Sequence, residues 1–115
     1  MPTTLQVSDE LAARIQAFGT WLPDIIELSL LGFRTPVAAA AAETISFLSR
    51  NPTPREVLKF HVANETQEHL RRLLTLNSAG LLSAAESCEL DEIERLEAVI
   101  FKLKTKSARH LQAKL

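Results

Sequence analysis

The sequence is short of several residue types, and each shortage excludes a class of protein. Of 115 residues, one is cysteine, none is tyrosine and 5% are aromatic. The single Cys88 excludes an internal disulfide and fits a reducing cytosol, and we expect it to be a partly buried structural thiol. Few aromatic rings are available to stack on nucleic-acid bases. Three glycines are too few for a turn-rich β protein.

Net charge and long hydrophobic runs are also lacking. A formal charge of −1 gives no general basic field of the kind that drives non-specific binding to nucleic acids. No apolar run approaches the roughly 20 residues that cross a membrane. The N-terminus lacks the basic leader and apolar core of a secretory signal. We therefore expect a cytoplasmic protein without membrane contact.

The last third of the sequence, residues 83–115, predicts one long helix. Ser83 and Glu86 have the spacing of a capping box, and no proline or glycine follows them. Acidic residues concentrate in the first half of this helix and basic residues in the second, as the helix dipole favours. An apolar stripe at helical spacing runs along it and consists of Leu90, Ile93, Leu96, Ile100, Leu103 and Leu111.

The upstream sequence predicts a short strand and then several capped helices. Residues 3–7 alternate in the manner of a strand. Helices are expected from Ser8 to Gly19, from Pro23 to before Gly32, from Thr35 to Asn51, from Thr53 to Phe60 and from Asn64 to near Asn77. Residues 64–115 therefore form a helical hairpin with a long second arm. The helix after Pro23 is apolar nearly all round, which indicates burial in the core or in a tight dimer.

These elements predict a mainly α-helical fold, in which a short N-terminal strand precedes a helical bundle with a long C-terminal helix hairpin. We expect the protein to be a dimer. The expected division is a strand–helix–helix dimerisation segment at residues 1–34, which resembles a ribbon–helix–helix, followed by a helical region at 35–115.

The strand–helix–helix order suggests one mode of DNA binding. In ribbon–helix–helix dimers, paired strands enter the major groove and alternate side chains reach the base edges. Here Thr4 and Gln6 would face DNA, while Leu5 and Val7 would pack inward. No lysine or arginine precedes Arg14, although contacts to phosphates normally use them. The alternative is a strand that only builds a dimer.

The sequence contains no catalytic or metal-binding pattern. His61, His69 and His110 are widely separated, and Glu65 with His69 supplies only two ligands on one helix face. The acidic residues between Glu86 and Glu97 are expected to form a solvated helix face. We therefore expect no enzyme activity, no metal and no cofactor.

The second half of the long helix is the expected contact with a partner protein. The first arm of the hairpin is much shorter than the second and can shield only about half of it. The remaining half keeps apolar and basic side chains that an amphipathic helix could insert into a groove on a partner. The expected partner-binding residues are Leu103, Lys104, Lys106, Arg109 and Leu111.

Three stretches resemble a family of small bacterial proteins that is best represented in cyanobacteria. They are TTLQVSDELAARIQAF, NPTPREVLKFHV and RRLLTLNSAGLLSAAESCELDEIERLEAVIFKLKTK, of which the last is the most distinctive. Members tend to be encoded beside small nucleases such as HNH or PIN proteins, so the resemblance implies an antitoxin-like role. The chain differs from the family in having AAES where a more acidic helix start is expected.

Residue patterns and resemblance together predict an antitoxin-like or regulatory module. It would neutralise or control a protein partner, such as a nuclease, through its C-terminal helices, with DNA-binding autoregulation as an additional activity. The alternative is a scaffold protein that only self-associates.

Overall fold

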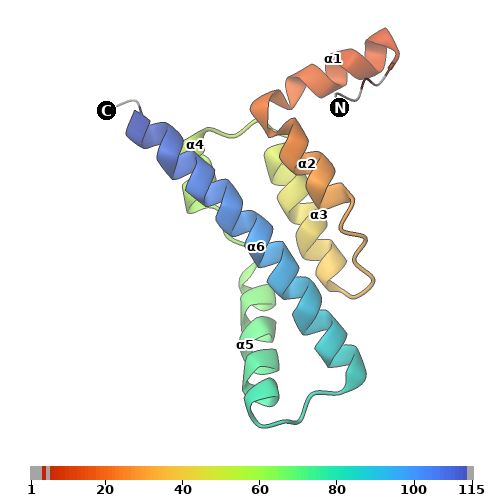
Figure 1. Cartoon of the computed structure of the whole chain (residues 1–115), viewed down its shortest axis with the longest axis vertical. Helices are drawn as coiled ribbons and strands as arrows, with labels where there is room; N and C mark the ends of the chain where they lie inside the picture. Colours follow the sequence, from red (N-terminus) through yellow and green to blue (C-terminus); the bar gives the residue numbers. More distant parts are fainter. Residues whose placement is uncertain (1–3, 5, 114–115) are drawn as a thin grey trace.

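The computed structural model describes residues 4 and 6–113, and these residues form a mainly α-helical fold with a long C-terminal helix (Figure 1). A short 3-10 turn, η1, connects the first two helices. The elements are α1 (Asp9–Ala17), η1 (Gly19–Trp21), α2 (Leu22–Ser29), α3 (Val37–Leu48), α4 (Pro54–Lys59), α5 (Asn64–Ser78) and α6 (Ala84–Ala113). The predicted order of helices is confirmed.

Local capping explains where several of these helices begin. The Ser8 hydroxyl accepts a hydrogen bond from the Leu11 backbone N–H at 3.2 Å. Thr53 and Glu56 form both bonds of a capping box at the start of α4. Ser83 and Glu86 form the same reciprocal pair before α6, with both distances 3.1 Å. Each arrangement satisfies backbone donors that a helix start leaves free.

The C-terminal hairpin is confirmed. Helices α5 and α6 pack against each other and are joined through Gly80, whose φ of +72° suits glycine. Helix α6 has 30 residues, and a helix of that length runs about 45 Å. It is the axis of the molecule, whose longest dimension is 51 Å. Lys114 and Leu115, which the sequence predicts to be helical, lie outside the described residues.

The predicted N-terminal strand is not seen. Thr4, Gln6 and Val7 belong to no regular element, whereas Thr3 and Leu5 lie outside the described residues. A strand requires a neighbouring strand to pair its backbone groups. The described part of the chain contains no strand, so the alternating pattern has nothing to pair with.

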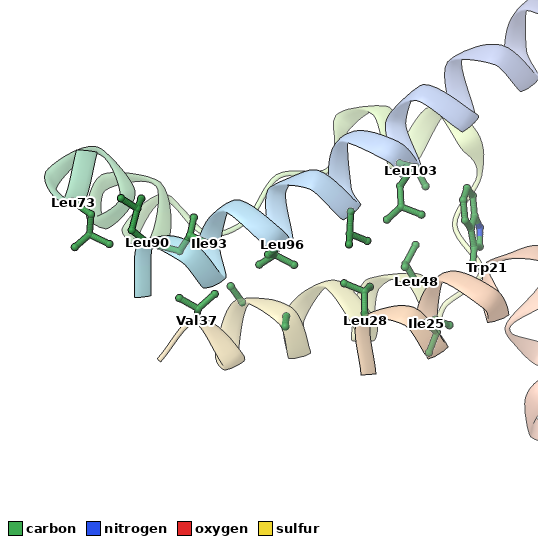
Figure 2. Close-up of a cluster of buried hydrophobic side chains, with 14 residues drawn as sticks. Trp21, Ile25, Leu28, Val37, Leu48, Leu73, Leu90, Ile93, Leu96 and Leu103 are labelled. Carbon is green, nitrogen blue, oxygen red and sulfur yellow. The ribbon is translucent and has the colours of Figure 1, made fainter. Parts of the chain in front are cut away.

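The core is a continuous seam between α6 and the helices packed along it. Figure 2 shows Leu96 pointing from α6 toward α2 and α3, and it is 2% exposed. One cluster contains residues from both predicted segments, 1–34 and 35–115. Its large members are Trp21, Ile25, Leu28, Val37, Leu48, Val57, Leu73, Leu90, Ile93, Leu96, Val99 and Leu103.

One packing prediction is tested in part and another needs correction. Within the single chain, Ile25 and Leu28 of α2 are buried, whereas Ile26 is 46% exposed and Leu30 is 78% exposed. The second half of α6 is not left uncovered beyond α5. Helix α4 packs closely against α6, and Leu103 is only 3% exposed.

Glu92 is an exception among the acidic residues of α6. We expected this run to be solvated, yet Glu92 is 6% exposed. Its carboxylate accepts hydrogen bonds from the backbone N–H of Arg34 at 2.9 Å, the backbone N–H of Thr35 at 3.1 Å and the Thr35 hydroxyl at 2.6 Å. These bonds fix the turn before α3 against α6.

None of the described helices combines the length and the apolar character that crossing a membrane would need.

Candidate functional site

The outward side of the second half of α6 forms a surface that we call the basic face. It consists of Phe101, Lys102, Thr105, Lys106 and Arg109, which line one surface depression of about 460 Å³. Positions 101, 105 and 109 follow one another at four-residue spacing and therefore lie on one side of the helix. The Phe101 side chain is 73% exposed. Aromatic and arginine side chains are enriched at protein–protein interfaces.

Both lysines of the basic face form ion pairs with acidic residues of α2. The Lys102 ammonium lies 3.0 Å from a Glu27 carboxylate oxygen. The Lys106 ammonium lies 3.5 Å from Asp24 Oδ2 and 5.7 Å from the centre of the Trp21 ring. These contacts orient both lysines toward α2. For Arg109, no carboxylate of residues 6–113 lies within ion-pair distance, so its guanidinium is available to a partner.

Asp24 is a buried carboxylate at the edge of this surface. It is 5% exposed, and its Oδ2 has no hydrogen-bond partner among the described residues. The contact with Lys106 is therefore a charge interaction without hydrogen-bond geometry. A buried carboxylate is costly unless a cation lies near it, so Lys106 serves the packing of α2 against α6.

A second surface, which we call the α5–α6 groove, lies on the other flank of α6. It encloses about 480 Å³. Leu74 is 44% exposed on its wall, and Arg71 and Lys104 give it a partly basic rim. Its lining is completed by His61, Val62, Gln67, Leu70, Glu97, Ile100 and Phe101. Phe101 thus forms the ridge between the groove and the basic face.

The five predicted partner-binding residues do not lie on one common surface. Arg109 is exposed on the basic face, and Lys106 is exposed but paired with Asp24. Lys104 lies at the rim of the α5–α6 groove, and Leu111 is half-buried. The prediction for Leu103 is wrong, because its side chain packs inside this chain beside Trp21 and Leu48 (Figure 2).

Sequence reasoning missed the two most accessible apolar side chains of these surfaces. Neither Phe101 nor Leu74 is among the partner-binding residues predicted from the sequence. A signal for Phe101 was available, since it falls four residues from Thr105 and eight from Arg109 on the polar side of the helix. No sequence signal places Leu74 at a groove, because that depends on the angle between α5 and α6.

Thr4 and Gln6, the predicted DNA contacts, are both exposed. The paired strands that would carry them into the major groove are not formed by the described residues. The geometry on which their assignment rested is therefore not seen among the described residues.

No metal centre is formed by the described residues, among which no three histidine, cysteine or acidic side chains cluster. His69 instead bridges the hairpin. Its Nε2 lies 2.6 Å from Glu89 Oε1, and the Arg72 guanidinium lies 2.9 Å from its Nδ1. Arg72 must donate to Nδ1, so Nε2 carries the proton and donates to Glu89. Cys88 is exposed rather than partly buried.

Comparison with known proteins found no matching family model, no matching curated protein and no matching solved structure.

Proposed function

We propose that this chain is a non-catalytic regulatory module that binds a protein partner through the basic face of α6. The observation that carries the proposal is Phe101, which is 73% exposed and lines the same surface depression as Arg109. Interface centres favour aromatic and arginine side chains, which supply most of the binding energy. The contact is the exterior of one helix, as expected for a module that docks against a groove in its partner.

The partner that we propose is a nuclease, in keeping with the antitoxin-like resemblance of the sequence. Nucleases that depend on Mg²⁺ hold the ion with carboxylates, and the exposed Arg109 of the basic face supplies a cation that complements an acidic active site. In this arrangement Phe101 anchors the contact, and Arg109 pairs with acidic groups of the partner. Thr4 and Gln6 have no part in this proposal.

Charge reversal on the basic face tests the proposal. Phe101→Glu and Arg109→Glu place like charge against an acidic partner, so each should weaken association at least about tenfold. The tagged protein is expressed in its native host, captured and analysed by mass spectrometry. We expect the unmutated chain to capture a nuclease and both variants to lose it.

Leu30→Glu is the matched control, since Leu30 is 78% exposed on the C-terminal side of α2 and outside the basic face. This variant should capture the partner as well as the unmutated chain does. Recovery of the chain alone from the host would instead support the scaffold alternative. Equal loss with all three variants would show that the basic face is not the binding surface.

A further inference from the structure

A cavity of about 420 Å³ lies where three distant segments of the chain meet, and we call it the Trp21 cavity. The turn η1 contributes Trp21, residues 51–54 lead from α3 into α4, and the C-terminal part of α6 contributes Ser107 and His110. Sites for small molecules usually measure about 300–1,000 Å³. The Trp21 cavity shares no residue with the α5–α6 groove and only Lys106 with the basic face.

The apolar wall of the Trp21 cavity is fixed by contacts within the chain. Trp21 and Pro52 are both buried, and the Trp21 indole N–H donates to the Pro52 carbonyl at 2.8 Å. Gly19 lies so close to Asn51 that a Cβ atom added there would be 2.5 Å from Asn51 Oδ1. These contacts hold η1 against the loop before α4. The wall is therefore formed before any ligand binds, and its two rings suit the flat face of an aromatic molecule.

The Ser107 hydroxyl lacks the hydrogen bond that other helix hydroxyls of this chain form. The hydroxyls that donate to the carbonyl four residues earlier include those of Thr44, Thr75, Ser78 and Thr105. Ser107 is 1% exposed, yet its Oγ has no hydrogen-bond partner among the described residues. A buried hydroxyl without a partner is unfavourable. Because Ser107 lines the cavity, an acceptor that enters the cavity would remove this cost.

The charged groups around the cavity favour an anion. Lys106 and His110 line it, and no acidic residue of 6–113 does so. The Lys106 ammonium lies 3.5 Å from Asp24 Oδ2, which forms no hydrogen bond with it. Its N–H donors therefore remain available to a ligand. The same ammonium lies 5.7 Å from the centre of the Trp21 ring, so the cation and the aromatic wall are neighbours.

We propose that the Trp21 cavity binds a small aromatic carboxylate. The Lys106 ammonium and the Ser107 hydroxyl donate to the carboxylate, and the aromatic ring of the ligand lies against Trp21 and Pro52. This inference goes beyond the proposed function, because it concerns a small molecule and its test needs no partner protein.

Titration of the full chain with benzoate tests the proposal. Trp21 is the only tryptophan, so its indole N–H gives one distinct signal in a proton–nitrogen correlation NMR spectrum. We expect benzoate to shift this signal in a saturable way. Benzyl alcohol keeps the ring without the charge and acetate keeps the charge without the ring, so each should bind at least about tenfold more weakly. An indole signal that does not shift with about 10 mM benzoate, or equal binding of either control compound, overturns the proposal.

Ser107→Ala tests the role of the hydroxyl. The variant loses a buried hydroxyl without a partner, so its melting temperature should stay the same or rise, whereas benzoate should bind at least about fivefold more weakly. Ser78→Ala is the matched control, because the Ser78 hydroxyl bonds to its own helix and does not line the cavity. This control should bind benzoate as the unmutated chain does. Unchanged benzoate binding by Ser107→Ala overturns the assignment of the hydroxyl to the ligand.

Lys106→Gln tests the cation through a ratio that does not depend on the stability of the variant. The unmutated chain should prefer benzoate to benzyl alcohol at least about tenfold. Lys106→Gln should bring the two dissociation constants close to each other, because the ring still meets Trp21 while the charge has no partner. A preference for benzoate that persists in this variant overturns the assignment of Lys106 to the carboxylate.

Discussion

Leu96→Ala is expected to lower the free energy of unfolding by about 2–5 kcal/mol, the usual cost of removing a buried leucine side chain. Leu96 is 2% exposed and lies at the middle of α6, where it points toward α2 and α3 (Figure 2). The truncated side chain leaves a cavity that helices packed on two sides fill only in part. Urea or guanidinium denaturation followed by circular dichroism measures the change.

Two comparison variants show whether this loss is specific to the core. Leu81→Ala alters a side chain that is 68% exposed in the turn between α5 and α6, and it should change stability by less than about 0.5 kcal/mol. Leu103→Ala should behave as Leu96→Ala does, because Leu103 is 3% exposed and belongs to the same core cluster. A small effect at Leu103 would mean that the second half of α6 is not covered by its own chain.

Glu92→Ala is expected to destabilise the fold by about 2–3 kcal/mol, because partly buried donors that lose a charged acceptor cost about 1–3 kcal/mol. The substitution leaves three donors, the two backbone N–H groups of Arg34 and Thr35 and the Thr35 hydroxyl, without their acceptor. Denaturant unfolding measures the loss. Glu94→Ala on the exposed side of α6 is the control and should have little effect. Equal losses in the two variants would assign the effect to helix propensity.

The same carboxylate predicts a loss of stability in acid. Burial, the largest single influence, raises the pKa of Glu92, but the hydrogen bonds from Arg34 and Thr35 together outweigh it and lower the pKa below its ordinary 4.5. A carboxylate with a lowered folded pKa stabilises the protein above the unfolded value. That contribution is lost as the pH falls through the folded pKa.

Glu92→Gln isolates this contribution, because glutamine does not titrate. The unfolding free energy of the unmutated chain should fall more steeply below pH 4.5 than that of the variant. The difference between the two curves removes the effect of other acidic groups, including Glu86, whose pKa is also lowered by hydrogen bonding to Ser83. Parallel curves for the two proteins would contradict the assignment to Glu92.

Much of the helical pattern follows from the sequence alone, because helix boundaries depend on local interactions. Ser8, Thr53 and Ser83 are capping residues that act within three positions of themselves. Gly19 ends the first helical region in the left-handed conformation, which glycine adopts readily because it has no Cβ atom. The apolar stripe of α6 was identified correctly at Leu96, since its spacing reports which side is buried.

The candidate site was predictable only in part. Arg109 was identified from the charge pattern of α6, and its exposure agrees with that interpretation. Phe101 is apolar and close to the stripe, so residue type suggested burial whereas its angle around the helix leaves it exposed. Leu103 follows the same periodicity as the core residues, but no local pattern shows that segments upstream of α5 cover it.

The helices, their caps and the hairpin formed by α5 and α6 could be predicted from the residues alone, because they depend on residues close together in the chain. The way in which the helices cover one another could not be predicted. Contacts between distant segments bury Leu103 in the core cluster, and donors more than 50 positions away bind the buried Glu92. Thr4, Gln6 and Val7, which alternate as a strand would, belong to no regular element. These outcomes depend on contacts between distant segments, which no local pattern specifies.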